Sequence, residues 1–447
     1  MLHPRVFTGT GLAAAFLAAV ACGGAPENAP AGPVPADDAG VAGGAGGGAT
    51  SADAPLTVTP IPSPAGPGSG EPVLASAGGS VYLSWIERRG GNREALLFAV
   101  WDGASWTTPG TIAEGVPFFV NWADTPSILP MADGTLVAHW LQKAGGETYA
   151  YHVMISRSGD GGATWSAPVS PHDDRSATEH GFVSLVDLGP GRFGAAWLDG
   201  RKYGAGAGSA AGTALMFAEY RGGTSRGETL LDPLVCDCCQ TAAVATPAGV
   251  VIAYRDRSPE EVRDISRVIV PAEPRATNPT PAPLSRDGWT IAGCPVNGPA
   301  LAASDARVVV AWFTGAKDAK RVYAALSSDA GATFGDPIRL DLGDPAGRVD
   351  VEWLADDRAL VTWIEDGPGE GSEVGEGPAS GGAARIMARI IDAGGTASAA
   401  FVLATTTGAR ASGFPRLAPA CGGLLMAWTD PADPPRVRLL RITPPSS

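Results

Sequence analysis

The hydrophobic pattern of the chain repeats seven times. Each repeat has a short apolar run, a turn that contains Gly or Asp, and a second apolar run, which predicts a strand, a tight turn and a strand. The second run always ends near an aromatic residue that polar residues follow: Trp85, Trp140, Trp197, Tyr254, Trp312, Trp363 and Trp428. The spacing of about 51 to 65 residues is typical of a four-stranded propeller blade with one long loop.

The seventh repeat lacks one strand. After each aromatic residue the pattern predicts a polar loop, a third strand and a fourth strand, but the chain ends after the third strand of the last repeat. The segment 55–62, PLTVTPIP, precedes the first repeat and can supply the missing strand, which would leave no open edge. We therefore predict an all-β, seven-bladed β-propeller closed by an N-terminal strand. A six-bladed ring with an accessory pair of strands is the alternative.

Composition agrees with one large all-β domain over residues 55–447. The 447 residues include 61 Gly and 39 Pro, and only 17% are charged, which suits many short strands and tight turns. The formal net charge of −14 argues against nucleic acid or an anionic membrane surface as a partner, because either requires a basic face. We expect a monomer.

The N-terminus is typical of an exported protein. Residues 1–22 combine Arg5, a short apolar core and Ala-Val-Ala-Cys, which resembles the lipobox of bacterial lipoproteins. We predict that Cys22 is lipidated, with ordinary secretory cleavage as the alternative. Residues 23–54 have almost no large apolar side chain, so we predict a disordered tether. The protein would then be periplasmic or at the cell surface, held to a membrane by lipid alone.

Two turns carry a more specific motif. Residues 158–165 (SGDGGATW) and 327–334 (SSDAGATF) resemble the Asp-box, or BNR repeat, of the sialidase superfamily. In such turns the Asp accepts backbone N–H bonds, the Gly takes a positive φ and the aromatic residue packs beneath the hairpin. In that superfamily these boxes lie away from the active site, so the resemblance implies a fold and leaves the chemistry open.

The resemblance also implies what a sialidase site would need: an arginine triad, a tyrosine nucleophile paired with a glutamate, an aspartate and an Arg-Ile-Pro motif. The chain has no Arg-Ile-Pro, and its seven repeats differ from the six blades of sialidases. Tyr203 is the tyrosine expected on the functional face, and Glu179 with Asp256 are the candidate acid and base of a glycoside hydrolase.

Polar residues are concentrated in the loops that enter the inner strands and in those between the second and third strands. These loops share one face of a propeller, where a ligand usually binds. The candidate residues for a glycan or peptide ligand are Asp124, His180, Asp199, Arg201, Arg255, Arg257, Asn297 and Arg348. Four of them are arginines that could hold a carboxylate group. Solvated surface charge is the alternative for any one of these residues, and a self-neutralising salt-bridge network is the alternative for the charged segment 254–264.

Cysteines cluster in two consecutive repeats. Cys236, Cys238 and Cys239 precede one inner strand and Cys294 precedes the next, so we expect the four to meet near the channel. Export favours disulfides, with at least one bridge to Cys294. The alternatives are a copper(I) or zinc site that His180 could join, and free or redox-active thiols. Three functions follow: a ligand-binding propeller, a sialidase-like hydrolase, and a metal or redox protein.

Overall fold

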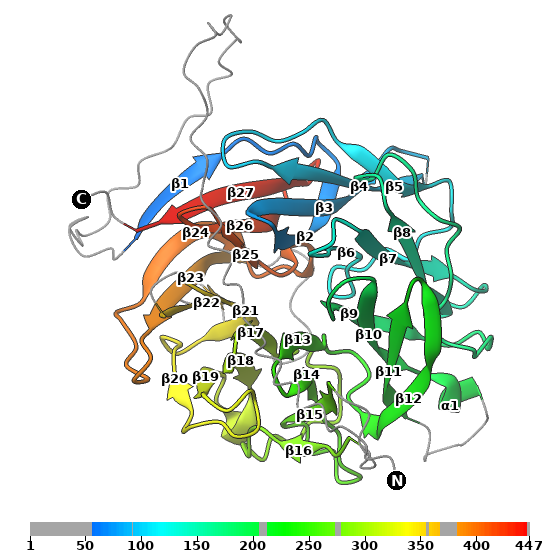
Figure 1. The fold of residues 1–447 in the computed structure, drawn as a ribbon. Helices are drawn as coiled ribbons and strands as arrows, with labels where there is room; N and C mark the ends of the chain where they lie inside the picture. The colour runs from blue at the N-terminus through cyan, green and yellow to red at the C-terminus, as the bar shows by residue number, and fades with distance from the viewer. Residues whose placement is uncertain are drawn as a thin grey trace, which may run out of the picture. The chain divides into compact units, whose positions relative to one another are not determined.

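The protein is a seven-bladed β-propeller, as the repeats predict. The computed structural model describes residues 56–91, 93–204, 212–272, 279–354, 357–366 and 382–444. Seven antiparallel sheets follow one another around a central axis, six with four strands and one with three (Figure 1). The six-bladed alternative is therefore wrong. The predicted signal segment 1–22, the lipidation site Cys22 and the tether 23–54 lie outside the described residues.

Each blade is a meander whose first strand faces the channel. Blades 1 to 3 contain β2 (Ser69–Ala77), β3 (Ser80–Arg88), β4 (Glu94–Trp101) and β5 (Gly110–Glu114); β6 (Ser127–Pro130), β7 (Leu136–Lys143) and β8 (Tyr151–Ser158); and β9 (His180–Asp187), β10 (Arg192–Asp199), β11 (Thr213–Arg221) and β12 (Thr224–Val235). Blade 4 contains β13 (Ala242–Thr246), β14 (Gly249–Arg255), β15 (Ile265–Pro271) and β16 (Ala282–Pro283).

Blades 5 to 7 complete the ring. They contain β17 (Ala300–Ser304), β18 (Arg307–Thr314), β19 (Arg321–Ser327) and β20 (Ile338–Arg339); β21 (Pro345–Trp353), β22 (Ala359–Asp366), β23 (Ala383–Ile391) and β24 (Phe401–Thr407); and β25 (Arg416–Ala420), β26 (Gly423–Asp430), β27 (Arg436–Thr443) and β1 (Thr57–Ile61). In the described part of the chain, short helical segments lie in loops: α1 (Arg201–Gly204), η2 (Ala316–Asp318) and η3 (Arg410–Ser412).

The first strand of the described chain belongs to the last blade. β1 pairs antiparallel with β27, from Thr57 opposite Thr443 to Ile61 opposite Leu439. It is the outermost strand of the blade that contains Trp428, which is the place predicted for residues 55–62. The pairing covers the edge of β27, so this blade has the same four strands as its neighbours.

The seven marker aromatics all lie on the second strand of their blade. Each is at most 8% exposed. The core lies between blades: Ala311 and Phe313 of blade 5 pack in one cluster with Val361 and Trp363 of blade 6. Burying a large side chain in this way contributes on the order of 2 to 3 kcal/mol, so the repeated aromatic explains both the strand pattern and the blade stacking.

The two Asp-containing turns have the same hydrogen bonds. Asp160 Oδ1 accepts the backbone N–H of Thr164 at 2.9 Å, and Ser158 Oγ accepts that of Gly162 at 2.8 Å. Asp329 and Ser327 repeat this arrangement in blade 5. Gly162 has a φ of +90°, and a Cβ there would lie 2.2 Å from the ring of Phe98 in blade 1. The turn therefore requires glycine at position 162, because the backbone has a positive φ there and because the ring of Phe98 in the neighbouring blade leaves no room for a side chain.

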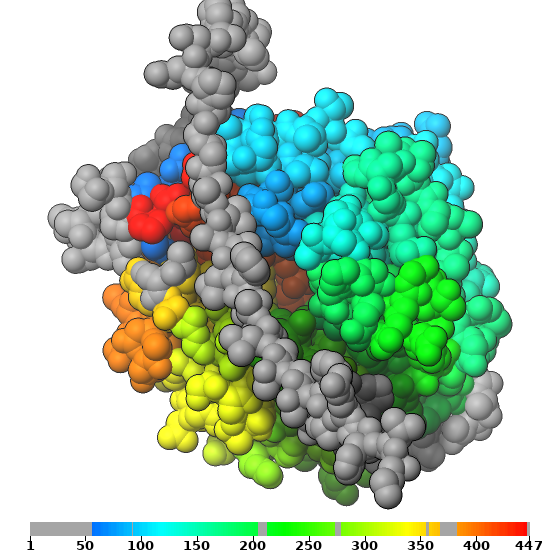
Figure 2. All heavy atoms as spheres, viewed as in Figure 1, coloured from blue at the N-terminus to red at the C-terminus, as the bar shows by residue number. Residues whose placement is uncertain are grey.

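The blades follow chain order around the ring. Figure 2 shows the colours of the described residues succeeding one another from blue to red, so each blade packs between the blades before and after it in sequence. Neighbouring inner strands also contact one another around the channel. Among the described helices, none has the length and apolar character needed to cross a membrane.

Candidate metal centre

Three cysteines occupy the tight turn that joins blade 3 to blade 4. The turn begins directly after β12, where the backbone N–H of Cys236 donates to the carbonyl of Arg255 at 3.0 Å. Cys239 lies at the other end of the turn, and its Sγ accepts the backbone N–H of Asn297 at 3.4 Å. The loop before the inner strand of blade 5 thus closes over the cysteine turn of blade 4. Adjacent inner-strand loops meet here, as the sequence predicted.

The sulfur atoms are close but are not bonded. Cys236 Sγ lies 3.5 Å from Cys239 Sγ and 3.9 Å from Cys238 Sγ, and all three sulfurs lie within 4.8 Å of one another. Cys294 is exposed, and its side chain is hydrogen-bonded to Cys238. All four are free cysteines. The disulfide expected between Cys294 and the others is therefore absent, because a bridge needs sulfurs about 2.05 Å apart. We call Cys236, Cys238, Cys239 and Cys294 the thiol cluster.

An arginine lies directly against the cluster. Arg263 Nη1 donates to Cys236 Sγ at 3.2 Å, and Arg263 is only 4% exposed. Burial raises the pKa of the Cys236 thiol, but hydrogen bonds from Cys238 and Cys239 and the charges of Arg263 and Arg255 outweigh it, so this pKa lies well below its usual range. The cluster is thus arranged to hold a thiolate, which is the form that binds metals.

The spacing of the sulfurs fits a metal ion. Zn²⁺ binds thiolates at about 2.3 Å, which places the sulfurs of a tetrahedral site about 3.8 Å apart. The distances of 3.5 and 3.9 Å lie close to this value. Cys236, Cys238 and Cys239 could supply three ligands, and Cys294, whose side chain is hydrogen-bonded to Cys238, is a candidate fourth. The arrangement suits a soft ion such as copper(I) or zinc.

Three residues expected to bind a ligand serve the fold instead. Arg255 is 2% exposed and donates to the carbonyls of Arg263, Asn297 and Phe313. Arg348 is 5% exposed, donates to the carbonyls of Gly408 and Ala409, and lies over the ring of Trp122. The guanidinium groups of both arginines therefore donate to backbone carbonyls inside the protein. The prediction that Arg255 and Arg348 hold the carboxylate of a ligand is wrong for these two residues.

Asn297 is also a positioning residue. Its Oδ1 accepts the backbone N–H of Arg348 at 2.6 Å, and its Nδ2 donates to the carbonyls of Pro295 and Ala346. The side chain is 8% exposed and holds the loop of blade 5 against that of blade 6. This fixes the backbone N–H of Asn297 that reaches Cys239.

A charged network surrounds the thiol cluster on its outer side. Arg257 pairs with Glu261 at 2.6 Å and with Asp237 at 3.2 Å, while Arg263 pairs with the same Glu261 at 2.7 Å. Asp237 Oδ1 also accepts the hydroxyl of Tyr203 at 2.9 Å. Tyr203 is 44% exposed, so this phenol is open to solvent beside the cysteine turn. Arg257 and Tyr203 thus lie beside the cysteine turn, where both are already paired with acidic side chains of the protein.

The predicted residues of blade 3 form a second network. Asp199 accepts the indole N–H of Trp197 at 2.9 Å and the guanidinium of Arg201 at 2.7 Å. Arg201 also pairs with Glu228 and Asp173. The guanidinium of Arg201 is thus paired with three carboxylates, those of Asp173, Asp199 and Glu228.

The candidate acid and base, Glu179 and Asp256, lie in different surroundings. Tyr151 donates its hydroxyl to Glu179 at 2.7 Å and contacts Asp124 at 3.0 Å. Burial and the charge of Asp237 raise the pKa of Glu179 to about 7, against the hydrogen bond from Tyr151. Asp256 instead accepts the hydroxyl of Ser266. The two carboxylates share no hydrogen-bond partner.

The tyrosine that pairs with a glutamate is Tyr151 and not Tyr203. Tyr151 is fully buried, stacked on Phe119 with 4.0 Å between ring centroids. The sequence did not indicate that Tyr151 pairs with a glutamate. Tyr151 begins the apolar strand β8, and a tyrosine in such a strand is expected in the core. The pair is a buried hydrogen-bonded unit, with Asp124 as its third member.

His180 is not a member of the thiol cluster. It lies with His152 and His172, and the three rings offer nitrogen atoms that all lie within 4.8 Å of one another. His152 is on β8, His172 is in the loop between blades 2 and 3, and His180 begins β9. The hydrophobic pattern of the chain gives no indication of a role for His152 or His172. Three of the five histidines of the chain fall between residues 152 and 180, which is the signal that could have found them.

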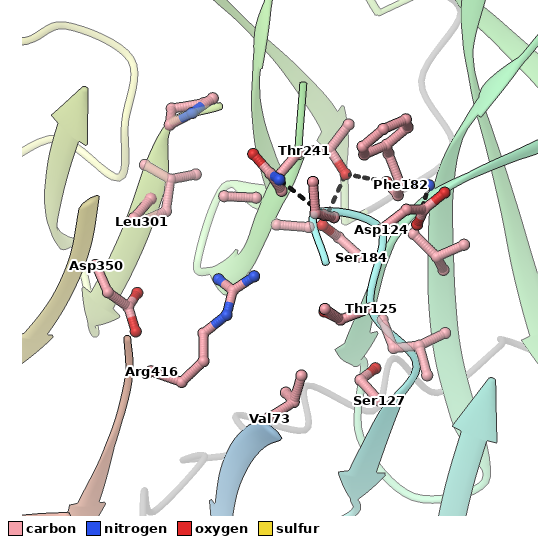
Figure 3. Close-up of a pocket in the computed structure, with 18 residues that line it drawn as sticks. Val73, Asp124, Thr125, Ser127, Phe182, Ser184, Thr241, Leu301, Asp350 and Arg416 are labelled. Atoms are coloured by element: carbon pink, nitrogen blue, oxygen red, sulfur yellow. Dashed lines mark hydrogen bonds between the residues drawn. The ribbon is translucent and has the colours of Figure 1, made fainter. Parts of the chain in front are cut away.

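The channel itself holds a small polar cavity of about 210 Å³. Every inner strand contributes to its wall, and Figure 3 shows Asp350 and Arg416 on one side facing Thr125, Ser184 and Thr241 on the other. Drug-sized ligands usually occupy pockets of about 300 to 1,000 Å³. A glycan or peptide would thus have to bind at the mouth of the channel.

Comparisons with known proteins point to the fold. No family model matches the chain, and neither does a curated protein. A crystal structure of the polysaccharide lyase Uly1 is similar at 10% identity with a TM-score of 0.51, over 84% of this chain and 90% of the lyase. A mutant NanB sialidase from Streptococcus pneumoniae gives 8% identity and a TM-score of 0.41, over 81% of this chain and 83% of the sialidase.

An α-L-arabinanase from Penicillium chrysogenum gives 12% identity and a TM-score of 0.45, over 86% of this chain and 98% of the arabinanase. These proteins share the propeller fold. At 10% identity, the similarity to the lyase describes the fold alone.

Proposed function

We propose that the protein is a metal-binding β-propeller that holds one copper(I) or zinc ion on the thiol cluster. The observation that carries this proposal is the gathering of three cysteine sulfurs within 4.8 Å of one another, beside an arginine that donates to one of them. The connections that lead into the five other blades contain no cysteine, so the propeller fold does not itself require cysteines at these turns.

The surroundings support a bound ion. Cys236 and Cys239 are 1% exposed, so their thiolates would be costly to bury without a positive partner. Arg263 supplies one positive charge, and a metal ion would supply the rest. Copper(I) accepts soft thiolates, whereas structural zinc sites are four-coordinate, so the choice of metal depends on whether Cys294 joins the other three.

The test is the metal content of the full chain purified without oxygen and without chelators. We expect about one equivalent of copper or zinc in the natural protein and in a His139→Gln control, whose changed side chain contacts Ser127 and lies outside the cluster. The double variant Cys236→Ser/Cys239→Ser should lose the ion. Thiol counting after denaturation gives a second readout: reduced thiols at all four positions agree with a metal site.

Two results would overturn the proposal. One is a natural protein that neither contains copper or zinc nor retains added copper(I) or Zn²⁺ through gel filtration. The other is a Cys236→Ser/Cys239→Ser variant that folds, as judged by its circular dichroism, and retains as much metal as the natural chain. Recovery of the four cysteines as disulfides would favour the bridging expected from the sequence.

A second candidate function is the binding of a glycan or peptide at the channel mouth. The observation that favours it is the exposed ring of Tyr203 beside the polar groups of Asp237 and Arg257. An aromatic face flanked by hydrogen-bonding groups suits a ligand with both apolar and hydroxyl surfaces. Tyr203→Ala should abolish binding to any oligosaccharide or peptide that the natural protein retains on an array, and unchanged binding would exclude this site.

Hydrolysis of a glycan has weaker support. Glu179, with its pKa of about 7, has the acidity of a general acid, but the tyrosine beside it is buried. Release of sugar from sialylated or other glycans by the natural protein, lost in Glu179→Gln, would establish the activity. Equal rates in the two proteins would exclude Glu179.

Export and lipid anchoring form part of the same proposal. The support is the signal-like segment 1–22 that ends in Cys22. Replacing Cys22 by Ser should move the protein from the membrane fraction to the soluble fraction of a bacterial host. A natural protein that is already soluble, with an N-terminus downstream of Cys22, would exclude lipidation.

A further inference from the structure

Three histidines of blades 2 and 3 each have a buried ring nitrogen that makes no hydrogen bond in the described structure: His152 Nδ1, His172 Nε2 and His180 Nε2. His180 Nε2 has a carboxylate oxygen of Asp174 3.0 Å away, whereas the nitrogens of His152 and His172 form no ion pair with a described residue. His172 is 2% exposed and His180 is fully buried. A buried polar atom without a partner costs on the order of 1 to 3 kcal/mol, so the nitrogens of His152 and His172 require an explanation.

The other nitrogen of the two most buried rings is held by backbone. His172 Nδ1 lies 2.9 Å from the carbonyl of Asp174, and His180 Nδ1 lies 3.2 Å from that of Thr178. Because a carbonyl accepts only, Nδ1 carries the proton in both rings. Nε2 of His172 then keeps its lone pair, whereas Nε2 of His180 faces the Asp174 carboxylate and would have to be free of a proton to bind a metal ion. Histidines that bind metals are usually oriented in this way, by a hydrogen bond from the second nitrogen.

The backbone around His180 is fixed by close contacts. Gly181 approaches Asp124 so closely that a Cβ would lie 2.0 Å from Oδ2, and Phe182 has a φ of +52°. The N–H of Phe182 donates to Asp124 Oδ1 at 2.7 Å. A bulkier residue at 181 would displace the start of β9, so the position of His180 is built into the strand.

Two carboxylates lie beside His180. Asp174 Oδ2 is 3.0 Å from His180 Nε2, and Asp199 Oδ1 is 3.7 Å from it. Asp199 already accepts from Trp197 and Arg201, whereas the protein donors to the Asp174 carboxylate in the described structure are the backbone and hydroxyl of its neighbour Ser176. Asp174 is therefore the nearer and freer of the two oxygen ligands.

We propose that His152, His172 and His180, with Asp174, form a second metal site that takes a divalent first-row transition metal ion such as Zn²⁺. Imidazole nitrogens suit zinc, copper, iron and nickel, and a carboxylate oxygen completes a four-coordinate set. Zn–N distances of about 2.0 to 2.1 Å place ligand nitrogens about 3.4 Å apart, so nitrogens within 4.8 Å must move closer together. The rings of His172 and His180 are stacked with an angle of 10° between their planes, so at least one of the two must rotate to aim its nitrogen at a shared ion.

This site is distinct from the thiol cluster. Its ligands come from β8, from the following loop and from the start of β9, whereas the cysteines lie in the turn before β13 and the loop before β17. It also differs in chemistry, because three nitrogens and an oxygen form a harder set than three sulfurs. The proposal stands whether or not the cysteines bind a metal.

The experiment uses the full chain with Cys236, Cys238, Cys239 and Cys294 all replaced by Ser, so that no thiolate site remains. After removal of metal by a chelator, the protein is titrated with Zn²⁺ and the heat of binding is recorded. We expect one equivalent to bind. X-ray absorption of the zinc-loaded protein should show imidazole ligands and no sulfur.

Single variants in that background test the ligands. His152→Gln should weaken zinc binding at least tenfold, and it is the safest change because His152 is only partly buried. His172→Gln should do the same. The matched control is His139→Gln, since His139 is fully buried and contacts Ser127 outside the three-histidine group. The control should bind zinc as tightly as its parent.

Clear outcomes would overturn the inference. One is an absence of stoichiometric zinc binding by a folded quadruple-Ser protein, confirmed in the natural chain by an absorption spectrum with sulfur ligands alone. Another is an equal affinity in the His152→Gln variant and the His139→Gln control.

Discussion

Arg263 Nη1 lies 3.2 Å from Cys236 Sγ, although the two residues are separated by the whole of β13 and β14. The contact places a positive charge on the one cysteine of the thiol cluster whose pKa lies well below its usual range. The contact links the charged segment that follows β14 to the cysteine turn. These two segments are separate in the sequence.

The first prediction concerns this contact. In metal-free protein, Arg263→Gln should raise the pKa of Cys236, because the charge that stabilises the thiolate is lost. Thiolate absorbance in an ultraviolet pH titration should therefore appear at higher pH than in the natural chain. Arg263→Lys keeps the charge and should shift the titration less. A titration that is identical in all three proteins would contradict the assigned role of Arg263.

The second prediction is a dependence of stability on pH at Asp124. Burial and the nearby charge of Glu179 raise the pKa of Asp124 to about 8, against hydrogen bonds from Phe182 and Tyr151. A carboxyl group whose pKa is raised on folding stabilises most below its unfolded pKa of about 4, and this stabilisation is lost as the pH rises through about 8. The melting temperature should therefore fall between pH 5 and pH 9.

Asp124→Asn is the matching change. An amide can keep the bond from Phe182 N–H through its oxygen and donate to the Tyr151 hydroxyl, but it does not titrate. We expect its melting temperature to fall by no more than about half as much as that of the natural protein over the same pH range. An equally steep fall would assign the pH dependence to other groups, with Glu179 as the first to examine.

The third prediction compares two adjacent glycines. Gly161 and Gly162 have φ values of +72° and +90°, but a Cβ on Gly161 meets nothing within 4 Å, whereas one on Gly162 meets the ring of Phe98. Both Gly→Ala changes carry the backbone strain, and only Gly162→Ala adds the clash. Gly162→Ala should therefore lower the free energy of unfolding by about 1 to 3 kcal/mol more than Gly161→Ala. Equal denaturant midpoints would show that Phe98 moves aside freely.

The fourth prediction concerns β1. A chain that begins at residue 62 lacks β1 and exposes the edge of β27, so it should aggregate and unfold at a lower temperature. A chain that begins at residue 56 retains β1 and serves as the control. Light scattering and thermal denaturation of the two chains make the comparison, and equal behaviour would mean that the ring does not depend on this strand.

The fold was predictable because the signal for it is repeated. Each blade places an aromatic residue at the same position of the second strand, and the packing between blades requires a large buried side chain there. The missing strand of the last repeat could be inferred from the count alone. The meeting of the cysteine turns also followed from the repeat, since neighbouring blades place equivalent loops together.

The roles of individual polar residues were harder to predict. Arg255 and Arg348 precede or enter loops like ligand-binding arginines, but they satisfy carbonyls from segments 42 to 61 residues away in the chain. These partners are brought together by tertiary contacts, which the pattern of residues around each arginine does not predict. Tyr151 and His152 were hidden for the same reason, because residues in an apolar strand are assigned to the core. Whether the cysteines form disulfides depends on the distances between their sulfur atoms, and the positions of the loops in the sequence do not determine these distances.

The pairing of Thr57 with Thr443 also bears on how the protein is made. β1 pairs with β27, which lies near the other end of the chain. The seventh blade therefore cannot form until β27 has been synthesised. Contacts between such distant segments are slow to form, because nearly the whole chain is the loop that must close. During that interval the nascent protein has an open edge, and chaperones that bind exposed strands have time to act on it.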